Sequence, residues 1–145
     1  MSKRPTNEYS SLISMTLIEI DLFYQSLPEY DETIKECEKN YKLIIKNKDI
    51  QDNAKLHLLK ALVNKATRVN VGLMRKQRTM DGLEQRINKY LDSYHPSKEQ
   101  YFYTLNAYKT KKDEYDRKVN LFLLDCVGQI DKIEDKIFKD AEFKL

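Results

Sequence analysis

The chain has 145 residues, a length that suits one domain with a hydrophobic core of its own. Charged residues make up 34% of it and hydrophobic residues 41%, with only three glycines and three prolines, which is typical of long helices. The net charge of +3 describes a nearly balanced protein. Composition therefore predicts a single all-α domain over residues 1–145.

The first predicted helix covers residues 6–26 and is apolar around most of its circumference. A helix of this kind packs at the centre of a bundle or against a partner chain. Pro28 is expected to end it, because proline pushes the preceding residue out of the α region. The residues expected to contact a partner are Leu12, Met15, Ile18, Leu22 and Phe23.

A second helix is predicted over residues 29–46. Its apolar residues are spaced by three and four, and its other positions are mostly Glu and Lys, so one face should pack and the rest should meet solvent. The polar residues 47–53 come next and contain neither Gly nor Pro, which leaves both a turn and a continuous helix open. The apolar stripe is Tyr30, Ile34, Cys37, Tyr41 and Ile44.

The strongest pattern lies in a third helix, predicted over residues 54–93. Apolar residues there follow alternating steps of three and four for about five heptads, which indicates a coiled-coil-like helix. Only Lys76 interrupts the series. This seam consists of Leu59, Leu62, Ala66, Val69, Leu73, Met80, Leu83, Ile87, Tyr90 and Tyr94.

The segment His95-Pro96-Ser97 separates the third helix from a fourth, predicted over residues 98–138. One break between two long heptad helices predicts an antiparallel hairpin. The expected fold is therefore all-α, an elongated bundle of three to four helices built on a long antiparallel coiled-coil-like hairpin. The fourth helix carries the stripe Tyr101, Leu105, Tyr108, Tyr115, Val119, Phe122 and Cys126, continued by Ile130, Ile133 and Ile137.

In such a hairpin, Lys76 and Lys112 come to nearly the same level. Two ammonium groups facing each other in a packed seam are costly. The two helices could separate there, both lysine stems could extend outwards to solvent, or acidic residues could reach across. We favour the lysines extending outwards, because their stems are long. The alternative is a binding site at this level. The acidic residues within reach are Asp113, Glu114 and Asp116.

The sequence contains no phosphate-binding loop, nucleophile elbow, zinc-protease helix or calcium-binding loop. His57 and His95, the only histidines, should lie far apart in a hairpin. Cys37 and Cys126 fall on apolar stripes, where free cysteines behave as small buried hydrophobes. We therefore predict no enzyme activity, no metal site and no cofactor.

Positive charge gathers in the third helix. Residues 54–90 contain nine basic residues against two acidic ones, a local charge of +7, so the rest of the chain carries −4. Acidic residues of the other helices could neutralise this charge within the bundle, or it could attract an acidic protein or the phosphates of a nucleic acid. The candidate basic patch is Arg68, Arg75, Lys76, Arg78, Lys109 and Lys112.

Leu27-Pro28, followed by a helix and then by a basic heptad helix, resembles the N-terminal helical region of inhibitor-of-growth chromatin proteins over about residues 23–94. The spacing from Leu27-Pro28 to the next acidic helix departs from that pattern, and a Cys/His-rich zinc finger is absent. We do not assign the chain to that family.

The sequence favours a non-enzymatic helical scaffold or adaptor subunit that contacts another protein, or a second copy of itself, through helical faces. The alternative is a nucleic-acid-associated or chromatin-associated protein that binds phosphate backbone through the third helix. Glu19 and Asp21 interrupt the apolar run near the N-terminus, so neither a membrane span nor a signal peptide is predicted. An intracellular location, cytoplasmic or nuclear, is expected.

Overall fold

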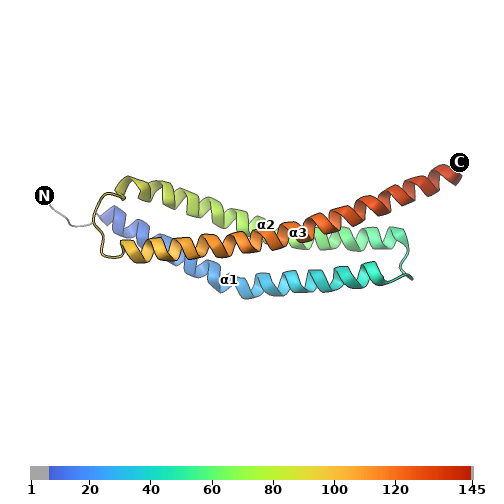
Figure 1. Ribbon diagram of the computed structural model, residues 1–145, viewed down its shortest axis with the longest axis horizontal. Coiled ribbons are helices and arrows are strands. Elements are labelled where there is room, and N and C mark those ends of the chain that lie inside the picture. The colour runs from blue at the N-terminus through green and yellow to red at the C-terminus, as the bar shows by residue number, and fades with distance from the viewer. Residues whose placement is uncertain (1–6, 145) are drawn as a thin grey trace. The chain divides into compact units, whose positions relative to one another are not determined.

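The computed structural model describes residues 7–144, which form three long α-helices and one short 3-10 helix (Figure 1). The long helices are α1 (Asn7–Lys46), α2 (Asp52–Ile87) and α3 (Lys98–Lys144), and the 3-10 helix η1 (Asn88–Tyr90) directly follows α2. No strand occurs within residues 7–144. The prediction of an all-α helical bundle is confirmed.

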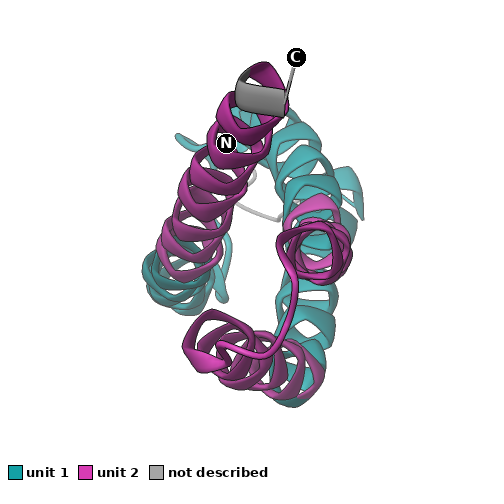
Figure 2. Cartoon of the chain, turned by 90° about the vertical axis from the view of Figure 1, so that its right-hand side faces the viewer, with its two compact units in different colours: residues 1–28, 72–115 teal, residues 29–71, 116–145 magenta. Residues whose placement is uncertain are grey.

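The chain divides into two compact units, and every long helix contributes to both (Figure 2). Unit 1 comprises Met1–Pro28 and Gly72–Tyr115, and unit 2 comprises Glu29–Val71 and Asp116–Leu145. Each unit therefore contains one segment of α1, one of α2 and one of α3. The single domain remains a prediction.

In unit 1, polar contacts define the directions of the helices. Glu8 accepts a hydrogen bond from the Tyr90 hydroxyl, and Glu19 further along α1 pairs with Lys76, earlier in the chain than Tyr90. The segments of α1 and α2 are therefore antiparallel. Phe23 of α1 meets Tyr108 of α3 edge to face, with ring centroids 4.9 Å apart.

In unit 2, α2 and α3 are linked by two ion pairs at the bundle surface. Lys60 pairs with Glu134 at 3.7 Å, and Asp52, the first residue of α2, pairs with Lys136 at 3.1 Å. These helices are therefore antiparallel, as the predicted hairpin requires. The core is a cluster of buried residues from all three helices: Cys37, Ile44, Leu59, Leu62, Ala66, Phe122, Cys126 and Ile130.

The predicted break at Pro28 is wrong, because α1 continues through this residue and joins the two predicted helices into one of 40 residues. A proline inside a helix costs about 3 kcal/mol or more. Phe23 and Leu27 before it and Ile34 and Cys37 after it are all buried, and burial of such side chains contributes about 1.5–3 kcal/mol each. Packing on both sides thus outweighs the local cost, and Pro28 itself lies on the exposed side of the helix.

The two connections lie close to their predicted places. Residues 47–51 connect α1 to α2, and the Asp49 N–H donates to the Asn47 side-chain oxygen, an Asx turn that holds the chain out of the helix. Ser97 directly precedes α3, and its carbonyl accepts the Tyr101 N–H. A turn, rather than a continuous helix, therefore occupies the polar segment.

Helix ends differ from the predicted ones. The predicted start of the first helix at residue 6 lies outside the described residues. The third helix ends at Ile87 instead of residue 93, which leaves Tyr94 exposed, whereas α3 continues past residue 138 to Lys144. Residues 138–142 are exposed good helix formers for the most part, so the loss of the apolar stripe does not end the helix.

The predicted heptad seams form the buried surfaces of both units. All of the seam from Leu59 to Ile87, apart from Lys76, is buried, as is the α3 stripe from Tyr101 to Ile130. Tyr90 is half-buried, as are Ile133 and Ile137 on the last turns of α3. Spacing alone therefore identified which faces of α2 and α3 pack.

Candidate protein-binding surface

The outward face of α1 in unit 1 carries three exposed apolar side chains, which we call the outer strip: Met15, Ile18 and Leu22. Their spacing of three and four places them on one side of the helix. Their exposed fractions are 47%, 58% and 45%, although these side chains are among the most apolar in the chain. The outer strip is therefore a continuous apolar surface over two helical turns.

The structure divides the five residues expected to contact a partner. Leu12 and Phe23 are each 1% exposed and belong to the core of unit 1. The Phe23 ring is in edge-to-face contact with the rings of Tyr24 and Tyr108. These two residues cannot contact a partner without unfolding, so the candidate surface is reduced to the outer strip.

A polar contact borders the outer strip on the side of α2. The Lys76 ammonium and the Glu19 carboxylate are 2.5 Å apart, with side chains 20% and 30% exposed. Partial burial strengthens this pair relative to one in bulk water, because the local dielectric is lower. Glu19 thus fixes the position of α1 against α2 at the level of the outer strip.

The ion pair between Lys76 and Glu19 also bears on the predicted approach of Lys76 and Lys112 in the hairpin. The acid that reaches Lys76 is Glu19 of α1, which was not among the three acids suggested from the sequence. Lys112 is only 7% exposed, so it does not extend to solvent as expected. A hairpin of α2 and α3 alone could not predict the ion pair of Lys76, because its partner Glu19 comes from α1.

The six residues of the candidate basic patch do not form one exposed surface. Arg68 belongs to unit 2 and the other five to unit 1. Within unit 1, Lys76 and Lys109 form ion pairs with α1 and α2 acids, and Lys112 is buried. The two remaining residues, Arg75 and Arg78, are exposed. Nucleic-acid binding through this patch remains a hypothesis.

Charge on the described N-terminal half of α1 has one sign. Residues 7–28, the described part of α1 in unit 1, contain three acidic residues and no lysine or arginine. Glu8 contacts Tyr90 of η1, Glu19 contacts Lys76 of α2, and Asp21, beside the outer strip, accepts a hydrogen bond from Gln25. A partner whose apolar side chains are flanked by basic residues therefore complements this surface best.

A serine and a histidine that are 85 residues apart meet at the end of unit 1, which the sequence did not reveal. The Ser10 hydroxyl lies 3.1 Å from His95 Nε2, and the Ser97 N–H donates to His95 Nδ1. Because Nδ1 accepts this hydrogen bond, the ring proton of the neutral imidazole is on Nε2, whose N–H donates a hydrogen bond to the Ser10 hydroxyl oxygen. His95 therefore cannot act as a base toward Ser10, and the pair joins α1 to the loop before α3.

Two tyrosine rings pack beside this hydrogen bond. Tyr9 is stacked on Tyr90 with centroids 5.3 Å apart, and it meets the His95 ring edge to face at 5.1 Å. Aromatic pairs of this geometry contribute about 0.5–1.5 kcal/mol beyond the buried area. The cluster therefore has a structural explanation, the attachment of the start of α1 to the end of the hairpin.

The geometry gives little support to metal binding or to thiol chemistry. Within residues 7–144, no group of three or more histidine, cysteine or acidic side chains is placed to hold a metal ion. Cys37 and Cys126 are free thiols in the core of unit 2, and burial raises the pKa of Cys126 to about 11. A thiol with so high a pKa is a poor nucleophile near neutral pH.

In the part of the chain that the structure describes, we find no helix with the length and apolar character needed to cross a membrane. Comparisons of the chain with protein-family models, with curated proteins and with solved structures find no match.

Proposed function

We propose that this protein is a non-enzymatic helical scaffold or adaptor subunit that binds another protein, or a second copy of itself, through the outer strip. The observation that supports this proposal is the exposure of Met15, Ile18 and Leu22 along one face of α1. Contiguous exposed apolar surface on a helix that is otherwise well packed is typical of protein-binding surfaces.

The size of the outer strip bounds the affinity it can supply. Complete burial of a Met, Ile or Leu side chain contributes about 1.5–3 kcal/mol, and each of these side chains is already about half buried. A partner therefore gains roughly 1 kcal/mol for each of them, or about 3 kcal/mol in total. Micromolar binding needs about 8 kcal/mol, so the partner must also contact residues beside the outer strip.

The proposal is tested with the double variant Ile18→Asp/Leu22→Asp. Both positions are exposed, so the fold should be retained, while two carboxylates in an apolar contact should prevent binding. Light scattering at micromolar concentration measures self-association, and affinity purification from the native source measures binding of other proteins. We expect the variant to lose either the dimer or a captured protein.

Tyr103→Asp provides the matched control, because Tyr103 on α3 is 79% exposed and lies in the same unit. This control should retain all binding. Circular dichroism must show equal helix content in both variants. A monomeric wild-type protein that captures the same proteins as the Ile18→Asp/Leu22→Asp variant would overturn the proposal.

A further inference from the structure

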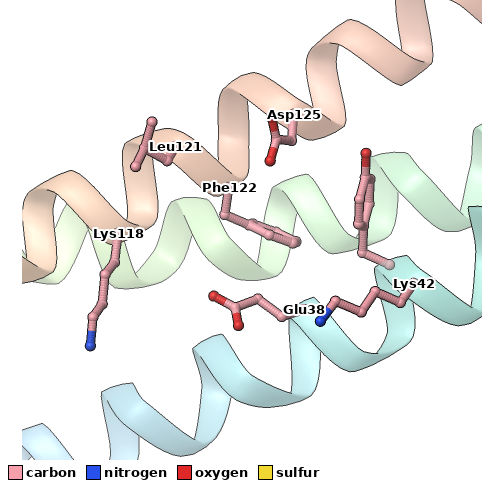
Figure 3. Close-up of a pocket in the computed structure, with 7 residues that line it drawn as sticks. Glu38, Lys42, Lys118, Leu121, Phe122 and Asp125 are labelled. Atoms are coloured by element: carbon pink, nitrogen blue, oxygen red, sulfur yellow. The ribbon is translucent and has the colours of Figure 1, made fainter.

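Unit 2 has a pocket of about 290 Å³ between α1 and α3, distinct from the outer strip (Figure 3). Its floor is aromatic, because the rings of Tyr41 and Phe122 meet edge to face with centroids 5.8 Å apart. Leu121 forms part of the wall and is 58% exposed. The remaining lining residues are charged: Glu38, Lys42, Lys118 and Asp125.

The volume of the pocket limits what it can hold. A cavity of about 150 Å³ accommodates benzene, and pockets for drug-sized ligands span about 300–1,000 Å³. The pocket between α1 and α3 therefore suits one large side chain, such as that of Trp, Tyr or Phe, rather than an extended cofactor. An aromatic ring would also find favourable geometry against Tyr41 and Phe122.

The apolar surface continues from the pocket along α3. Leu124, one turn beyond Leu121, is 68% exposed, and Val127 is 45% exposed. Gly128 follows Leu121 by two turns, about 10 Å, and a Cβ added there would meet no atom within 4 Å. An occupant of the pocket alone would leave this surface uncovered, whereas a helix lying along α3 would cover it and could approach closely at Gly128.

The charged residues around the pocket are two acids and two lysines. In Figure 3, Lys118 and Lys42 lie toward opposite ends of the pocket, and Asp125 and Glu38 lie above and below Phe122. A surface of this kind offers no net attraction to phosphate or to an anionic lipid surface. It complements a protein segment with acidic and basic residues on both sides of its apolar anchor.

We propose that this pocket and the adjoining residues Leu121, Leu124 and Gly128 bind an amphipathic helix of another protein, which inserts one aromatic side chain into the pocket against Tyr41 and Phe122. The aromatic side chain is the anchor, and charged residues one or two turns away on the bound helix meet the acids and lysines around the pocket. This surface lies wholly in unit 2, so it does not depend on the outer strip.

The test is a selection of displayed 20-residue helical peptides, with randomised central positions, against the full chain. Affinities of the enriched peptides are then measured by fluorescence anisotropy. We expect an aromatic residue at the centre of the enriched peptides, and at least a tenfold loss of affinity when it is replaced by Ala. Leu121→Asp should weaken binding at least tenfold.

Gly128→Gln separates docking from folding. Because a side chain at position 128 has open space and Gln is a better helix former than Gly, this variant should be at least as stable as the wild type. It should nevertheless weaken peptide binding at least tenfold, since it prevents close approach. Leu43→Asp and Ile18→Asp, at exposed positions of α1 outside the pocket, should leave the affinity unchanged.

Several outcomes would overturn the inference. These are the absence of enriched peptides, enriched peptides without a central aromatic residue, and equal binding to the wild type and to Leu121→Asp. Loss of binding in Ile18→Asp would assign the peptides to the outer strip instead. A wild-type dimer that Leu121→Asp converts to a monomer would identify a second copy of this chain as the occupant.

Discussion

Phe23 and Ile18 lie on the same helix, but their replacement by Ala should lower the free energy of unfolding by very different amounts. Phe23 is 1% exposed and in ring contact with Tyr108, whereas Ile18 is 58% exposed. Phe23→Ala removes a fully packed ring and should lower the free energy of unfolding by about 3–5 kcal/mol. Ile18→Ala removes a half-exposed side chain and should cost less than about 1 kcal/mol, because Ala also favours the helix.

Urea denaturation followed by circular dichroism measures the difference. With a slope of about 2 kcal/mol per molar urea, Phe23→Ala should shift the midpoint downward by about 2 M, and Ile18→Ala by less than about 0.5 M. Equal shifts for the two variants, or a shift below about 0.5 M for Phe23→Ala, would refute the placement of Phe23 in the core of unit 1 and of Ile18 on its surface.

Three further predictions follow from individual contacts. A double-mutant cycle with Glu19→Gln and Lys76→Met should give a coupling energy of about 1 kcal/mol, reduced in 1 M NaCl, since the pair is partly buried; a coupling indistinguishable from zero would contradict the contact. Gly82→Ala should raise the free energy of unfolding by up to about 1 kcal/mol, because an added Cβ meets no atom within 4 Å, and a loss of stability in urea would be inconsistent with that space. Burial raises the pKa of Cys126 to about 11 and of Tyr101 to about 12. Because both groups ionise more readily in the unfolded chain, the free energy of unfolding should decline as the pH rises from 9 toward 12. A urea midpoint that does not change over that range would count against this burial.

The packed faces of α2 and α3 could be predicted because heptad spacing directly encodes which side of a helix is buried. Leu59, Leu73 and Ile87 are all fully buried, as their spacing predicts. The prediction of a helix end at Pro28 failed because it used local sequence alone. A local rule predicted a helix end, but apolar residues on both sides pack in the core, and tertiary packing outweighs one lost hydrogen bond and a proline ring.

The outer strip could be predicted only in part. An apolar residue on α1 is equally apolar whether it faces the core, as Leu12 does, or solvent, as Ile18 does, and only the positions of α2 and α3 decide between them. The pocket in unit 2 could not be predicted at all, because Tyr41 and Phe122 lie 81 positions apart in the chain and meet only after folding.

Photo-crosslinking from position 18 tests the proposed protein contact most directly. A benzoylphenylalanine introduced at Ile18 and irradiated in living cells should form one discrete cross-linked species, either with another protein or with a second copy of the chain. The Leu22→Asp substitution should abolish this species, and the same probe at the exposed residue Gln85 of unit 1 should not form it. No cross-linked species from position 18, or the same species from position 85, would contradict the role of the outer strip in binding.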